Sequence, residues 1–394
     1  MTRAPLTIMA VLAALLLGVW WLTDGRAEEP APAPKVAPVA EIAKRVEAIR
    51  GLRFDILPKP VEVTPEQARR EGLEDLDRSY PRERRLADEE TLKLLGLIDP
   101  SVDLREVSGS VFSEGVAGYY DPRTKHLRVV RGAQTTNRFL YEITLAHELT
   151  HALEDQRFGL SPQEGTNDDR ALARLALIEG SATLVMERYL LRYFSAEEAL
   201  AGVLGSAFAT GPDLPPFLQA QLLFPYTSGM AFVQELVRRA GGRWTLVDLA
   251  DRARPPDSTE QVLHPEKYLR VEQPLPVSLD AHLGGGWRRA ASGVWGEWAT
   301  SELVGEAAAA GWGGDRYELW QRPGGACPAP CRARDALVMR WRWDTPAAAR
   351  RFTPALRAWS ATRPGPVAIA ARGRDVTLVL APDPALARRL ARAG

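Results

Sequence analysis

Apolar side chains recur at helical spacing in two long segments near the middle of the chain, residues 138–156 and 169–194. One face of the first segment carries Leu140, Ile143, His147 and His151. One face of the second carries Leu172, Leu175, Ala176, Ala182, Met186 and Tyr189. A polar loop at residues 161–168 separates them. We therefore expect two long helices, each with a buried face.

Shorter patterns predict the elements around these two helices. Further helices are expected at residues 42–49, 65–80, 86–97, 199–209, 224–240 and 244–251, and an extended stretch at residues 52–63. Residues 118–130 are typical of two strands joined by a tight turn, because Asp121-Pro122-Arg123-Thr124 is a turn sequence. An edge strand here could hold an extended substrate, although an ordinary structural hairpin would give the same pattern.

From residue 311 to residue 394 the pattern changes to a small β-β-α-β-β-α unit. Strands are expected at residues 317–320, 337–343, 367–371 and 376–380, and helices begin after Thr345 and Asp383. This segment holds no catalytic constellation. Its Cys327 and Cys331 are the only cysteines, and in an exported protein they favour a small loop disulfide.

The N-terminus indicates export. Arg3 precedes an apolar run at residues 5–21, and Gly25-Arg26-Ala27 offers small residues for cleavage after Ala27. The run is also long enough to act as an uncleaved single membrane anchor, with Trp20 and Trp21 at the interface. Either way the remaining chain would lie beyond the cytoplasmic membrane, after a Pro/Ala-rich linker at residues 28–40.

The 394 residues contain 50 basic and 50 acidic side chains, so the net charge is zero. No overall field favours nucleic acid or an anionic membrane surface. The composition is that of a globular protein, and the sequence predicts two folded units, at residues 41–310 and 311–394, after the signal and linker segments.

The candidate chemistry lies in the first long helix, at His147-Glu148-Leu149-Thr150-His151. On a helix, His147 and His151 are one turn apart on the same face, and Glu148 lies beside them. Two imidazoles at this spacing can bind one Zn²⁺, and the Glu can reach a water molecule on it. A three-histidine site is excluded locally, because Glu154 and Arg157 stand where Gly and His would be needed.

Glu179, in the second long helix, is the candidate third ligand. Its neighbours at helical spacing are Leu175, Ala182 and Met186, so the carboxylate lies on the apolar face. A buried carboxylate needs a cation, a hydrogen-bond cage or a proton, and zinc would meet that need. Gly180, Ser181 and Ala182 are small and would let this helix approach the first one closely.

These residues resemble the gluzincin group of zinc metallopeptidases, in which thermolysin-like enzymes bind zinc through His, His and Glu. The resemblance covers roughly residues 118–268, and the string from Gly118 to Pro122 makes the chain look more like exported bacterial HExxH proteins of this type. It departs from thermolysin at Ile178 and Thr183, where that family has Asn and an acidic residue. Asp168 and Asp169 are candidates for the hydrogen-bond partner of the first histidine.

The resemblance implies an α+β fold: a mainly helical zinc-metallopeptidase domain with a small substrate-edge sheet, followed by the C-terminal α+β unit. It also implies hydrolysis of a peptide or protein substrate, with Glu148 as the general base. Gluzincins need one more donor facing the oxyanion, for which His264 and Tyr226 are the candidates. The alternative function is a zinc-stabilised, catalytically inactive binding or scaffolding module of the cell envelope.

Overall fold

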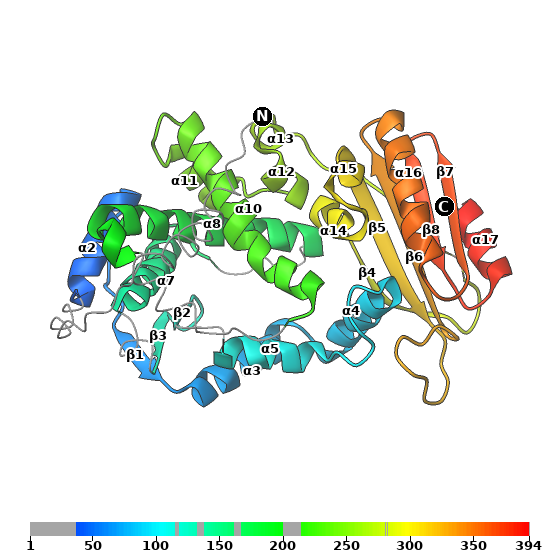
Figure 1. The fold of residues 1–394 in the computed structure, drawn as a ribbon, viewed down its shortest axis with the longest axis horizontal. Coiled ribbons are helices and arrows are strands. Elements are labelled where there is room, and N and C mark those ends of the chain that lie inside the picture. The colour runs from blue at the N-terminus through cyan, green and yellow to red at the C-terminus, as the bar shows by residue number, and fades with distance from the viewer. Residues whose placement is uncertain are drawn as a thin grey trace, which may run out of the picture.

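The structure is a computed structural model that describes residues 37–114, 118–131, 138–160, 167–199, 214–279, 281 and 283–393. The expected signal or anchor segment, most of the linker, most of the loop at residues 161–168 and nearly all of the expected helix at residues 199–209 lie outside the described residues. Within the described ranges, no helix is both long enough and apolar enough to cross a membrane. The fold is α+β, as expected (Figure 1).

A helical body comes first in the chain. Its elements are α2 (Val39–Arg50), β1 (Pro60–Val63), α3 (Pro65–Ser79), α4 (Arg82–Leu95), α5 (Leu104–Glu114), β2 (Gly118–Asp121), β3 (His126–Val130), α7 (Arg138–Phe158), α8 (Asp168–Tyr193), α10 (Pro216–Arg239), α11 (Thr245–Ala253), α12 (Thr259–Leu263) and α13 (Pro265–Leu269). The extended stretch expected at residues 52–63 is a strand only over its last four residues.

The expected helix at residues 224–240 starts earlier than predicted. The predicted start was Phe224. In the structure α10 begins at Pro216, and Pro225 lies inside it. Tyr226 is therefore held in the middle of a long helix instead of at a mobile end.

The first sheet has the strand order β1-β3-β2, which makes β2 an edge strand. Strands β2 and β3 pair antiparallel, with Tyr120 opposite Leu127, and the turn between them is closed by the Asp121 side chain, which accepts the backbone N–H of Arg123 at 2.9 Å. Leu127 and Val129 are both buried, so they share one face as expected. The predicted hairpin is confirmed.

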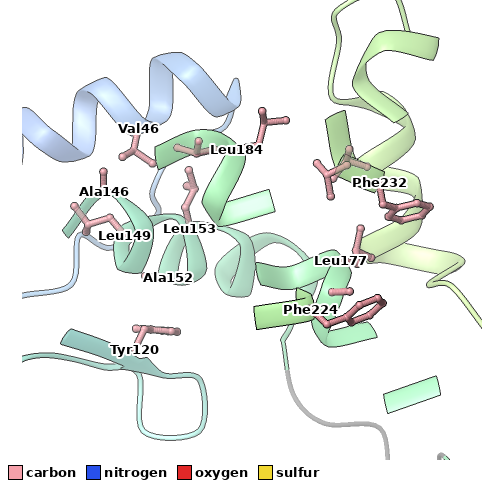
Figure 2. Close-up of a cluster of buried hydrophobic side chains, with 14 of the residues drawn as sticks. Val46, Tyr120, Ala146, Leu149, Ala152, Leu153, Leu177, Leu184, Phe224 and Phe232 are labelled. Atoms are coloured by element: carbon pink, nitrogen blue, oxygen red, sulfur yellow. The ribbon is translucent and has the colours of Figure 1, made fainter. Parts of the chain in front are cut away.

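Helix α7 passes through the centre of the main core (Figure 2). Its residues Ala146, Leu149, Ala152 and Leu153 are almost fully buried. Val46 of α2, Tyr120 of β2 and Leu184 of α8 lie around them, and the same core extends through Leu177 of α8 to Phe224 and Phe232 of α10. Because most of its side chains are buried in a close-packed core, α7 is held firmly in place.

The C-terminal unit is built on a second sheet with the order β4-β5-β6-β8-β7, antiparallel throughout. Its elements are β4 (Arg288–Gly293), α14 (Gly296–Val304), α15 (Glu306–Ala309), β5 (Trp312–Gln321), β6 (Asp335–Trp343), α16 (Pro346–Ala361), β7 (Val367–Arg372), β8 (Asp375–Leu380) and α17 (Pro384–Ala393). The β-β-α-β-β-α order matches the prediction from β5 onward. The sheet begins before the expected boundary at residue 311, because β4 pairs with β5.

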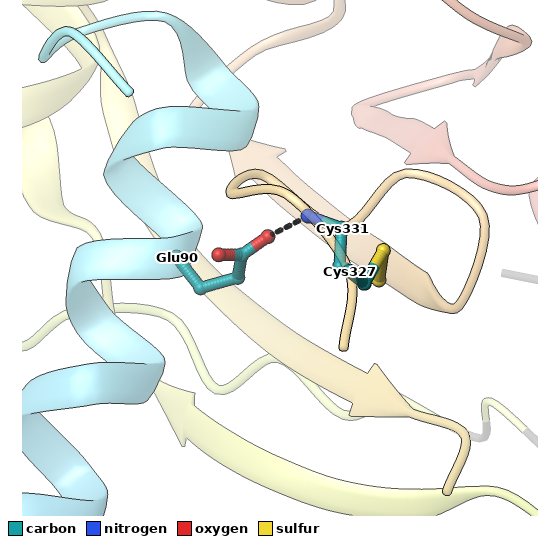
Figure 3. The surroundings of a disulfide bond; sticks show 3 residues. All are labelled: Glu90, Cys327 and Cys331. Atoms are coloured by element: carbon teal, nitrogen blue, oxygen red, sulfur yellow. Dashed lines mark hydrogen bonds between the residues drawn. A yellow bond between two sulfur atoms is a disulfide. The ribbon is translucent and has the colours of Figure 1, made fainter. Parts of the chain in front are cut away.

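The expected disulfide between Cys327 and Cys331 is present in the loop between β5 and β6 (Figure 3). The backbone N–H of Cys331 donates to Glu90 of α4. Helix α4 also contributes Leu94 and Leu95 to the core of the C-terminal unit. The two units are thus joined by a helix that comes from the first of them.

Polar contacts complete the junction between the units. Arg84 of α4 bonds to Asp168 of α8 at 2.7 Å and to the Tyr317 hydroxyl of β5 at 2.8 Å. Next to them Asp169 is buried and accepts hydrogen bonds from the backbone N–H of Thr259 at 3.1 Å and from its hydroxyl at 2.5 Å. Burial, opposed by these bonds and assisted by Asp315, raises the pKa of Asp169 to about 7.

We expect Asp169→Asn to flatten the pH dependence of stability. An unfolded Asp titrates near pH ~4, so between about pH 4 and 7 the folded protein holds a proton that the unfolded chain has released. The stability from the protonated side chain is full below that window and is lost as the pH rises through about 7. In urea denaturation, the free energy of unfolding of the wild type should fall about 2 to 3 kcal/mol more than that of the variant between pH ~5 and pH ~8. If the free energy of unfolding falls equally with pH in the wild type and in Asp169→Asn, the prediction is wrong.

Candidate metal centre

Three side chains from the two central helices converge at one point. His147 and His151 come from α7 and Glu179 comes from α8. The two Nε2 atoms are 3.0 Å apart, and Glu179 Oε2 lies 3.1 Å from His147 Nε2 and 3.4 Å from His151 Nε2. The group that the sequence predicted from helical spacing is therefore assembled in the structure.

The donor set fits a metal ion. A tetrahedral zinc with ligands at about 2.0–2.1 Å holds its donor atoms about 3.3 Å apart, close to the three separations in this group. All three atoms point toward one another, and both histidines are only 8% exposed. Such a cluster of nitrogen and carboxylate lone pairs is stable only with a positive charge among them. The group could hold a metal ion.

The electrostatics of the group agree with this conclusion. Burial by itself would raise the pKa of Glu179, but His151 and His147 outweigh it and hold that pKa well below its usual range. Burial would lower the pKa of His151, yet the Glu179 carboxylate raises it to about 9. The site therefore favours positive charge strongly, and a divalent cation can supply it in place of a proton.

Glu148 lies next to the group on α7 and is only 9% exposed. Burial raises its pKa, and this effect is opposed by the neighbouring histidines and by a hydrogen bond from the backbone N–H of Tyr120. That N–H belongs to the edge strand β2, and a Cβ placed on Gly118 of the same strand would lie 3.7 Å from Glu148 Cγ. The strand edge and the carboxylate are thus in direct contact.

The structure separates the two candidates for the extra donor. The Tyr226 ring stacks on the His147 ring at 6.0 Å between centroids and 28° between planes, and its hydroxyl bonds to Glu179. Burial and the nearby Glu179 and Glu148 raise the pKa of Tyr226. His264 instead forms the corner between α12 and α13, where its Nε2 lies 3.0 Å from Glu297. Tyr226 joins the metal group, and His264 does not.

Tyr226 reaches the group because α8 and α10 cross at two glycines. A Cβ on Gly229 of α10 would lie 2.1 Å from the Ala176 carbonyl oxygen of α8, and a Cβ on Gly180 would lie 2.2 Å from the Gly229 carbonyl carbon. Gly180 was expected to bring α8 toward α7, but it faces α10. On the α7 side, the contact is made by Ser181, whose hydroxyl donates to Glu154.

We expect Gly229→Ala to destabilise the protein by about 1 to 3 kcal/mol, because the added methyl group forces the two backbones apart. The same shift should move Tyr226 away from Glu179. Urea denaturation measures the loss of stability. Gly285→Ala is the matched control, because a Cβ there meets nothing within 4 Å. Equal stabilities of the two variants would contradict the tight crossing.

Asp155 and Glu154 of α7, to which the sequence alone assigned no role, hold neighbouring elements against this helix. Asp155 accepts the Tyr120 hydroxyl at 2.8 Å and the Lys125 ammonium at 2.6 Å, which attaches the β2–β3 hairpin to α7. Glu154 is fully buried and accepts Arg50 Nε of α2 at 2.6 Å. These roles could have been predicted, because Glu154 and Asp155 follow the buried His151 by three and four residues. Carboxylates at this spacing lie near the same helix face and need hydrogen-bond or ion-pair partners there.

The expectation that Asp168 or Asp169 supports the first histidine is wrong. Both lie in the first turn of α8, about 15 Å of helix or more from Glu179 at 1.5 Å per residue. Their partners are the residues of the junction described above, Arg84, Tyr317 and Thr259. Although they belong to the same helix as Glu179, they lie too far along it to reach the histidines.

Comparison with known proteins adds little chemistry. A family described as a domain of unknown function, DUF8575, matches residues 287–391, which begin one residue before β4. No curated protein matches the chain. A solved structure from Chloroflexus aurantiacus, titled "putative hydrolase with a novel fold", is 21% identical with a TM-score of 0.37, covering 67% of this chain and 97% of that one.

Proposed function

We propose that this protein is an exported zinc-dependent peptidase. The observation that carries the proposal is the convergence of His147 Nε2, His151 Nε2 and Glu179 Oε2, with the Glu148 carboxylate beside them. Three protein ligands leave one tetrahedral position open, which is typical of catalytic zinc sites, whereas structural sites close with a fourth protein ligand.

The three ligands would hold zinc, and the ion when bound would supply a Lewis acid and lower the pKa of water toward about 7. Glu148 would take the proton from the water that attacks the scissile carbonyl and would then deliver it to the leaving amine. Its burial suits this role, because a raised carboxylate pKa brings proton affinity nearer to the working pH. The Tyr226 hydroxyl, next to Glu179, would donate to the oxyanion.

The edge strand β2 supports a peptide as the substrate. The backbone N–H of Tyr120 donates to Glu148, so the unpaired side of β2 lies at the carboxylate that acts as base. An extended chain can add to such an edge through main-chain hydrogen bonds. Added there, a substrate would present its own backbone to Glu148 and the metal group.

The test is cleavage of unfolded casein and of a peptide mixture by the purified protein, with and without a chelator. We expect cleavage that the chelator abolishes and that added zinc restores. Bound metal with no cleavage under any condition would overturn the proposal and favour the zinc-stabilised binding module. Fractionation of cells that express the full chain, with N-terminal sequencing of the product, tests export and cleavage after Ala27 separately.

A further inference from the structure

A cavity of about 560 Å³ lies between the helical body and the C-terminal unit. Its walls are mainly apolar and include Leu172 and Leu175 of α8, Leu218 and Leu222 of α10, and Trp295 and Trp298 at the start of α14. The volume falls within the range of ligand-binding pockets, about 300–1,000 Å³. Neither the metal ligands nor Glu148 line it, so it is a separate feature of the molecule.

Two residues that line the cavity lie one helical turn from residues at the metal centre. Leu175 precedes Glu179 by four residues on α8, and Leu222 precedes Tyr226 by four residues on α10, so each pair shares a helix face. The Tyr226 hydroxyl bonds to Glu179, so the two faces meet at the metal group. Leu175, Leu222 and Tyr226 are 43%, 41% and 37% exposed, which means that large apolar side chains are open to solvent along this path.

The opposite end of the cavity is polar. Asp88, Asp168 and Tyr317 line it there, and Arg84 bonds to all three. From Glu179 to Asp168 the helix spans eleven positions, about 16 Å at 1.5 Å per residue. An extended peptide advances about 3.3 Å per residue, so about five residues fit between the metal group and this polar end.

The cavity and the exposed apolar path from it to the metal group are together called the groove. We infer that the groove binds an apolar segment of about five residues in an extended polypeptide, on one side of the bond that is cleaved. The inference rests on the proposed function and adds the substrate class to it. Unfolded chains rich in leucine and aromatic residues would be preferred, and cleavage would occur within the chain, because the groove holds several residues beyond the scissile bond. The C-terminal unit takes part in recognition through Trp295 and Trp298.

The experiment measures binding apart from turnover. Fluorescent peptides that differ only in one segment, leucine and phenylalanine against serine and asparagine, are titrated into zinc-loaded Glu148→Gln protein and followed by anisotropy. Leu222→Gln is added to this background. It should weaken the binding of the apolar peptide roughly tenfold and have little effect on the binding of the polar peptide. Leu223→Gln is the matched control, because Leu223 is the next residue, is 47% exposed and does not line the cavity.

Each outcome decides one question. The proposed groove is wrong if both peptides bind equally well, or if Leu222→Gln and Leu223→Gln lose equal affinity for the apolar peptide. Either result would stand even if the wild type cleaves casein. Tight binding of a labelled fatty acid that excludes the apolar peptide also overturns it, because the groove would then serve a lipid. Selective loss with Leu222→Gln supports the groove even if the wild type cleaves nothing, and in that case the proposed function alone fails.

Discussion

Glu148→Gln should retain zinc and lose peptide cleavage by about a thousandfold, within the range of about 10²–10⁴ for general acid–base groups. Glutamine has the same shape, and its amide oxygen can still accept the Tyr120 N–H that bonds to Glu148. It cannot take a proton from the attacking water. Metal content by atomic spectroscopy and casein cleavage per folded molecule measure the two properties independently.

Glu142→Gln is the control for this variant. Glu142 lies on the same helix and is fully buried, and it accepts the backbone N–H of Ala37 at 2.9 Å and the Tyr189 hydroxyl at 3.1 Å. Removing its charge should lower stability and leave cleavage per folded molecule within a few-fold. If Glu148→Gln with full zinc cleaves as fast as the wild type, Glu148 is not the base.

Glu179→Gln should weaken zinc binding by at least roughly a hundredfold, because changes to outer partners of a ligand alone cost about 10–100-fold in metal affinity. The variant replaces a charged donor by a neutral one in direct contact with both histidines. Its amide can still hydrogen-bond to the imidazoles, so we expect the metal-free variant to fold. Competition with a chromophoric chelator gives the affinity.

Thermal melting gives a second measurement of the same change. Zinc at about 100 times its dissociation constant should stabilise the wild type by about 2.7 kcal/mol. At the same zinc concentration the stabilisation of Glu179→Gln should fall to about 0.4 kcal/mol or less. Glu187→Gln is the control on the same helix, because Glu187 is not among the residues that converge on the site. Equal zinc stabilisation of both variants would rule out Glu179 as a ligand.

Local patterns were enough to predict much of the fold. Helices α7 and α8 appear within a few residues of their expected bounds, because apolar side chains recur at helical spacing through both segments. The expected buried faces are only partly right, since Leu175 of α8 is 43% exposed. The strands and helices from β5 to α17 also follow local alternation and capping signals. Strand β4 was missed because Arg288-Arg289-Ala290-Ala291 has no large alternating apolar residues, and only pairing with β5 makes it a strand.

The oxyanion donor could not be chosen from local sequence patterns. His264 and Tyr226 were both candidates in the sequence, and the proline beside His264 was compatible with a functional loop or with a structural corner. The choice depends on Gly180 and Gly229, which are 49 positions apart (229 minus 180) yet let α8 and α10 touch. No periodicity within either helix indicates which small residue faces which neighbour.

The sequence by itself determined that His147 and His151 lie one turn apart on one helix, and it marked Glu179 as a candidate ligand on a second helix. The packing of α8 against α7 brought the three side chains together. Tertiary structure alone decided what surrounds the group: Tyr226 at Glu179, the Tyr120 backbone at Glu148, and an apolar groove between the two units. The physical reason is how far apart in the chain the interacting residues lie. Ligand spacing follows from helix geometry, whereas the surroundings depend on how separate elements pack, and that packing is set by contacts between residues far apart in the chain.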